Sequence, residues 1–189
     1  MKKIILVAFI TSVITTLIGC NNTNEAVIFD GATQIELSDG EIKADGEVIG
    51  TNTDASIYIA NDIVYYESGH DFTYGEGNEE DAHTEEEATA HTVVHISQPG
   101  TYCLSGELSK GQIAVDLGEE AKDDSEAVVT LILNDVDITC EVAPAIIFYN
   151  VYECGDTDTE NASKDVDTTT AGANVVIADV NCSTLLKCA

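Results

Sequence analysis

From Thr92 onward, the apolar residues come in short runs of Val, Ile, Leu and Thr, and each run ends at Gly, Asn or Asp. β-Branched residues suit a half-buried pleated surface, and the residues that end each run readily form turns. The runs are too short and too regularly broken for amphipathic helices. The sequence therefore predicts an all-β protein. The strands expected in this region are residues 93–97, 101–105, 113–117, 128–133, 136–139, 145–151 and 173–180.

Before this region, three Asp-Gly pairs separate short apolar segments. They lie at residues 30–31, 39–40 and 45–46. Because an Asp-Gly pair tolerates positive φ, it reverses the chain between two strands at low cost. We expect brief strands at residues 27–29, 35–37 and 47–49 and a further β-rich segment at 56–66. Residues 67–90 hold nine carboxylates and three glycines with no apolar stripe, so we expect a solvated excursion there.

A weak repeat connects three of the expected strands. Residues 133–136, 148–151 and 177–180 each read as an apolar residue, a variable residue, Asp or Asn, and Val. In a solenoid, such a motif marks a corner, where a short polar side chain accepts unusual backbone angles. Chance similarity between β-rich segments is the alternative explanation.

The N-terminus has the three parts of an export signal that ends in a lipobox. Lys2 and Lys3 precede the apolar residues 4–18, and the sequence Leu-Ile-Gly-Cys closes the run at Cys20. The apolar run is too short to span a bilayer as a mature helix. We therefore expect residues 1–19 to be removed, Cys20 to be lipidated, and residues 20–26 to tether an extracytoplasmic protein to the cell membrane. A plain signal peptide with an incidental cysteine is the alternative.

The charge of the chain restricts its partners. The formal net charge is −28, with 35 acids and no arginine. A strongly negative field repels nucleic acid and anionic lipid head groups, and without arginine there is no bidentate fork for phosphate. Nucleic acid is therefore excluded as a partner, whereas solvation or the collection of hard cations remains open.

Two groups of residues suggest metal binding. Asp156, Asp158, Glu160 and Asp167 stand at positions 1, 3, 5 and 12 of a calcium-loop spacing, although position 6 is Asn161 rather than Gly. We expect these four acids to be calcium ligands, with a solvated acidic loop as the alternative. The four histidines bracket the acidic excursion and suggest a separate hypothesis, capture of a divalent transition metal by residues 70–95. These histidines are His70, His83, His91 and His95.

The sequence also resembles a known family in three places. Residues 98–116 read QPGTYCLSGELSKGQIAVD, residues 129–139 read VTLILNDVDIT, and residues 172–179 read GANVVIAD. This pattern resembles the carbohydrate-binding β-helix lipoproteins of clostridia and their relatives. The resemblance implies a right-handed parallel β-helix, related in shape to pectate lyases, that binds polysaccharides including acidic, pectin-like chains with calcium. The resemblance covers residues 92–179, so we expect the start of a carbohydrate-binding domain at 92–189, preceded by the N-terminal β-rich and acidic loop region at 27–91. The pattern stops after Asp179, which looks like a truncation.

For sugar binding we expect Tyr149 and Tyr152 to offer ring faces and Asn134 and Asp137 to offer hydrogen bonds. The alternative is that the tyrosines are half-buried strand residues and that the polar pair belongs to turns. The arginine base usual in pectate lyases is absent, and no spacing singles out a pair of catalytic carboxylates. We therefore expect a binding protein rather than an enzyme, with metal capture second and a polysaccharide lyase third.

Overall fold

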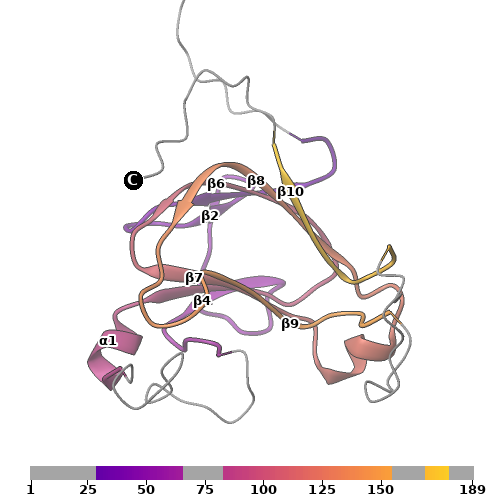
Figure 1. The fold of residues 1–189 in the computed structure, drawn as a ribbon. Helices are drawn as coiled ribbons and strands as arrows, with labels where there is room; N and C mark the ends of the chain where they lie inside the picture. The colour runs from indigo at the N-terminus through magenta and orange to yellow at the C-terminus, as the bar shows by residue number, and fades with distance from the viewer. Residues whose placement is uncertain (1–28, 66–82, 155–168, 179–189) are drawn as a thin grey trace, which may run out of the picture.

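The computed structural model describes residues 29–65, 83–154 and 169–178. Short strands dominate these residues, and the helical elements are a single turn each (Figure 1). The strands are β1 (Thr33–Leu37), β2 (Lys43–Ala44), β3 (Glu47–Val48), β4 (Ile57–Ala60), β5 (Thr92–Ile96), β6 (Gly100–Leu108), β7 (Gly111–Asp116), β8 (Val129–Ile138), β9 (Ile146–Asn150) and β10 (Ala173–Ile177). The helical elements are α1 (Glu85–Thr89) and the 3-10 helix η2 (Glu119–Asp123). None of the helices in these ranges is long and apolar enough to cross a membrane.

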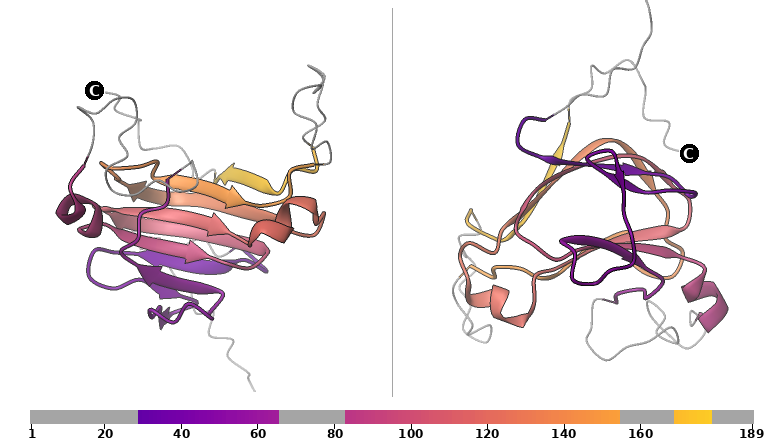
Figure 2. Two further views of the ribbon diagram at one scale, coloured as in Figure 1. Left: turned by 90° about the horizontal axis from the view of Figure 1, so that it is seen from below. Right: turned by 180° about the vertical axis from the view of Figure 1, so that it is seen from behind.

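The strands form two sheets that face each other as two layers (Figures 1 and 2). Sheet A has the order β10-β8-β6-β1-β2-β3, and sheet B has the order β4-β5-β7-β9. From β5 to β10 the chain alternates between the two sheets, and each strand from β7 onward lies parallel to the strand two places before it. Strands from before and after residue 92 therefore share both sheets.

The expected all-β class is confirmed, but the sheets are mixed, unlike the parallel sheets expected of a β-helix. The antiparallel pairs are β1 with β2, β2 with β3, and β4 with β5. For β2 and β3 the cause is the turn at residues 45–46, where Asp45 has φ 50° and Gly46 has φ 82°. A two-residue turn of this kind can join only antiparallel strands, because a parallel connection needs a much longer crossover.

The core lies between the sheets. Alternate side chains of each strand point inward and meet those of the opposite sheet, as the two-residue period of a strand requires. The largest fully buried members are Ile35, Val94, Ile96, Leu104, Leu108, Ile113, Val115, Val129 and Leu131. Each such side chain contributes about 1.5–3 kcal/mol relative to an exposed one.

The repeat motif does not mark a corner in its first copy. The strands expected at 128–133 and 136–139 are one strand, β8, and Asn134 and Asp135 together face Ser105 of β6. Asp135 has φ 52°, so the extra residue is accommodated as a β-bulge within the strand. The second copy ends β9 at Asn150. The third copy runs past the described residues.

The expected solvated excursion contains a helical turn. Thr84 caps α1: its hydroxyl accepts a hydrogen bond from the Glu87 N–H, and the Glu87 carboxylate accepts from the Thr84 N–H. This reciprocal capping box forms at the spacing Thr-x-x-Glu and does not depend on an apolar stripe. Residues 85–89 thus form a helical turn within the expected excursion, and they are exposed to solvent except for the buried Ala88.

Candidate functional site

The four residues expected to bind sugar lie on different sheets. Asn134 and Asp137 belong to β8 in sheet A, whereas Tyr149 belongs to β9 in sheet B and Tyr152 follows that strand. Asn134 is buried, and its side chain contacts the thiol of Cys103, whose pKa is raised by burial. Asp137 is exposed, and its register partner in the neighbouring strand β6 is Glu107. The structure does not bring the four residues together in one site.

Tyr149 packs on the outer face of sheet B. Phe148, the residue before it, packs into the core between the sheets, whereas Tyr149 contacts a small cluster on the opposite side. That cluster consists of Val93, Ala114 and Ile147, with Ile63, Val64 and Tyr149 packed against it. Both Tyr149 and Tyr152 are half-buried. This exposure is the one expected if they are ordinary strand residues.

The expected metal ligands are not seen as a site. Asp156, Asp158, Glu160, Asp167 and His70 lie outside the described residues. Among the residues that are described, no group of three or more His, Cys, Asp or Glu side chains is placed to hold a metal ion.

His91 has a structural contact at each ring nitrogen. It is 1 % exposed, and its Nδ1 lies 2.8 Å from the Glu87 carbonyl oxygen. Its Nε2 accepts a hydrogen bond of 3.3 Å from the Glu141 N–H. Because Nε2 accepts, the proton sits on Nδ1, and the ring is neutral in this arrangement. Neither nitrogen of His91 is available to a metal ion without breaking one of these contacts.

The His95 side chain contacts two other side chains, those of Asp62 and Tyr58, on the outer face of sheet B. Its Nε2 lies 2.8 Å from Oδ1 of Asp62, and an ionised carboxylate only accepts, so this nitrogen carries the proton. The ring of Tyr58 is stacked on the His95 ring, with centroids 4.5 Å apart and planes inclined by 4°. The stacking follows from the register, because Tyr58 of β4 is the direct cross-strand partner of His95 of β5.

Asp116 adds a second negative charge near Tyr58. Burial first, and then the charges of Asp62 and Asp116, raise the pKa of the Tyr58 hydroxyl. Oδ1 of Asp116 accepts hydrogen bonds from Nδ2 of Asn150 at 2.8 Å and from the Gly118 N–H at 2.9 Å. Asp116 is thus fixed by its own contacts. We call Tyr58, Asp62, His95 and Asp116 the Tyr58 cluster.

Residues 61–65, here called the strap, hold Asp62 in place. The Asn61 side chain donates a hydrogen bond to the His91 carbonyl. The side-chain amide of Gln112 accepts from the Val64 N–H and donates to the Val64 carbonyl, both at 2.9 Å. The strap is therefore fixed to sheet B on both sides of Asp62 and Ile63. The partners lie 30 to 48 residues apart in sequence, so no local signal predicts this arrangement.

Chemically, the Tyr58 cluster combines an aromatic ring with an exposed carboxylate on a fixed scaffold. The Asp62 side chain is 64 % exposed, whereas the His95 side chain is 8 % exposed. Aromatic faces with a few well-placed polar groups are typical of small-molecule and sugar sites. Sequence reasoning placed Tyr58 and Asp62 in a β-rich segment and assigned neither a role.

Residues 90–182 match the sequence model of a family described as carbohydrate-binding domain-containing protein. This part of the chain is similar to that family. It includes β5 to β10, the strands that alternate between the sheets, so His95 and Asp116 lie inside it and Tyr58 and Asp62 precede it. No curated protein and no solved structure matches the chain.

Proposed function

We propose that this protein is an extracytoplasmic lipoprotein that binds polysaccharide without chemically changing it. The observation that carries the proposal is the match of residues 90–182 to a carbohydrate-binding family. The matched residues form stacked parallel strands, which present long faces of regularly spaced side chains. A long face of this kind suits an extended polymer.

We interpret β5 to β10 as the first turns of a parallel β-helix, right-handed as the resemblance implies. In support, consecutive strands change sheets, and each of β7 to β10 pairs in parallel with the strand two places earlier. The antiparallel strands β2, β3 and β4 then close the N-terminal end of the stack. Their role is to cover edges that are otherwise open to pairing with another chain.

The proposed ligand is an acidic, pectin-like polysaccharide, and calcium supplies the attraction. A chain of charge −28 repels a polyuronate, but a divalent ion bridges two carboxylates that otherwise repel each other. Asp156, Asp158, Glu160 and Asp167 are the proposed calcium ligands because of their spacing.

The proposed anchor is lipid on Cys20. The support is the signal-like sequence that ends in Leu-Ile-Gly-Cys. Intact mass of the protein extracted from membranes tests it: loss of residues 1–19 and addition of diacylglycerol at Cys20 are expected. The matched control is Cys20→Ser, which is expected to leave the membrane fraction or stay unprocessed. An unmodified Cys20 in the mature wild type contradicts the anchor.

Calorimetric titration with polygalacturonate, with and without calcium, tests the binding proposal. Heat of binding in the presence of calcium is expected, with the polymer unchanged in length. A falling polymer length with new unsaturated ends contradicts the non-catalytic role and favours a lyase. If titration with zinc gives heat of binding and titration with polysaccharide gives none, the result favours metal capture by residues 70–95.

A further inference from the structure

Tyr58 occupies the edge of sheet B. Its strand, β4, is the terminal strand of the sheet, and β5 lies on its inner side. The His95 ring covers one face of the Tyr58 ring from the β5 side. The opposite ring face is directed away from β5, beyond the edge of the sheet. Tyr58 as a whole is half-buried, so the residue is not closed off from solvent.

Asp62 is held beside this ring by one of its two carboxylate oxygens. Its Oδ1 accepts the hydrogen bond from His95. Its Oδ2 has no hydrogen-bond partner among the described residues, and the side chain is 64 % exposed. The strap fixes the backbone on both sides of Asp62, so the carboxylate is positioned before any ligand arrives. Such pre-organisation lowers the entropy cost of binding.

The Tyr58 ring face and the Asp62 carboxylate together complement a pyranose ring. One side of a pyranose carries C–H groups that pack on an aromatic face, and its rim carries hydroxyl groups that donate hydrogen bonds. The Tyr58 ring offers the face, and Oδ2 of Asp62 offers an acceptor. Asp116 contributes its charge to the cluster, and the hydrogen bonds that its Oδ1 accepts from Asn150 and Gly118 hold it in place.

The charge of the cluster selects among sugars. Asp62 and Asp116 are both negative, and the described part of the chain places no lysine in contact with either. A uronate bound here brings a third carboxylate close to two others, and no cation compensates. An uncharged sugar unit has no such penalty.

We propose that the outer face of the Tyr58 ring, together with Asp62, binds an uncharged pyranose unit of a polysaccharide. This inference rests on the proposed function, since it assigns one contact surface to polysaccharide binding. It adds a surface that precedes the family match and that recognises neutral sugar without calcium.

Affinity electrophoresis and calorimetry of the full chain with galactan and xylan, both free of calcium, test the proposal. Tyr58→Ala is expected to weaken binding about tenfold, the size of effect that loss of one aromatic contact produces. Tyr58→Phe keeps the ring and is expected to bind like the wild type. Asp62→Ala removes an exposed side chain and is expected to weaken binding severalfold. If Tyr58→Ala does not fold, Asp62→Ala and Tyr58→Phe carry the test.

Asp54→Ala is the matched control for Asp62→Ala, because Asp54 is another exposed acid close to β4 in sequence. It is expected to retain wild-type affinity. Unchanged binding in both Tyr58→Ala and Asp62→Ala overturns the proposal, as does a loss in Asp54→Ala equal to that in Asp62→Ala. Wild-type protein that binds polygalacturonate with calcium but neither neutral polymer overturns this inference and leaves the proposed function standing. Wild-type protein that binds no polysaccharide overturns both.

Discussion

The side-chain amide of Gln112 pairs with the main chain of Val64 in both directions. Its oxygen accepts from the Val64 N–H and its nitrogen donates to the Val64 carbonyl, each at 2.9 Å. The same nitrogen donates to the Pro144 carbonyl at 2.9 Å. Gln112 is completely buried. One side chain of β7 thus joins the strap to sheet B and to the chain that enters β9.

Replacement of Gln112 by Met tests this role, because Met keeps the length of the side chain but removes the amide. Three hydrogen bonds are lost and their backbone partners are left buried or must reach water. We expect the free energy of unfolding, measured by urea denaturation, to fall by about 2–4 kcal/mol.

The matched control is Gln34→Met. Gln34 is half-buried in β1, and its side chain bonds only to the nearby carbonyls of Phe29 and Ala32. We expect a loss of about 1 kcal/mol or less. Equal losses in the two variants contradict a special role for Gln112.

Gly106 is required by the close approach of β6 to β1. It has φ +93°, and a Cβ atom there would meet the Leu37 carbonyl oxygen at 2.3 Å. The two residues are register partners in the parallel pair, so neither can move without disrupting the sheet. We expect Gly106→Ala to lower the free energy of unfolding by about 3 kcal/mol or more.

Gly118→Ala separates the cost of a positive φ from the cost of the steric clash. Gly118 has a similar φ of +88°, but nothing lies within 4 Å of an added Cβ atom. It therefore reports the conformational cost alone, about 1–3 kcal/mol, because φ +88° with ψ 160° is a backbone region that essentially only glycine adopts. A loss in Gly106→Ala no larger than in Gly118→Ala refutes the steric account.

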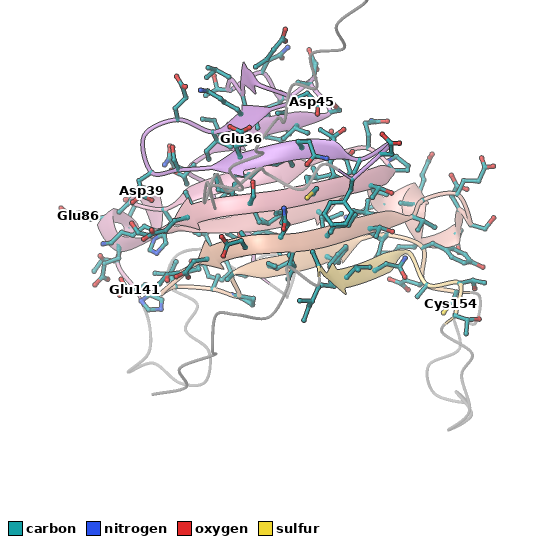
Figure 3. The ribbon with its side chains drawn as sticks, turned by 90° about the horizontal axis from the view of Figure 1, so that it is seen from above. Glu36, Asp39, Asp45, Glu86, Glu141 and Cys154 are labelled. Atoms are coloured by element: carbon teal, nitrogen blue, oxygen red, sulfur yellow. The ribbon has the colours of Figure 1, made fainter. Side chains whose placement is uncertain are left out.

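Asp39 gives the fold a defined dependence on pH. It lies in the turn after β1 (Figure 3), and it accepts from the Ser109 hydroxyl at 2.6 Å and the Ser109 N–H at 2.7 Å. These bonds, the hydroxyl first, hold the pKa of Asp39 below its ordinary value of 3.8. The stabilisation is therefore present above pH 3.8 and is lost as the pH falls through the lower, folded-state pKa.

We expect the difference in stability between the wild type and Asp39→Asn to be constant near neutral pH and to shrink as the pH falls below 3.8. Urea denaturation at a series of pH values measures it. Asp123→Asn removes one exposed acid from η2 and serves as the control for the loss of a charge. A difference that grows on acidification contradicts the assigned role of Ser109.

The strands were predictable because their signals are local. Short apolar runs with terminal Gly, Asn or Asp located β5, β6, β7, β9 and β10, and the pair at 45–46 located the turn before β3, whereas no strand was expected at β2. The bulge in β8 was missed because Asn and Asp also favour turns, and the sequence does not distinguish the two outcomes. The helix α1 was not predicted, although the spacing of Thr84 and Glu87 is that of a capping box.

The Tyr58 cluster could not be predicted from the sequence. Asp62 meets His95 across 33 residues, and Tyr58 meets His95 only because β4 pairs antiparallel with β5 in one particular register. A shift of one residue in that register turns Tyr58 to the other face of the sheet. The expected sugar residues failed to converge for the same reason, because sequence does not reveal that β8 and β9 belong to different sheets.

The most direct test of the central claim is the affinity of the purified, folded full chain for polysaccharides, measured by calorimetry over polygalacturonate with calcium, galactan and xylan. We predict saturable binding to at least one of these polymers with no change in polymer length. Absence of binding to all three, with the protein shown to be folded by its cooperative unfolding, contradicts the account.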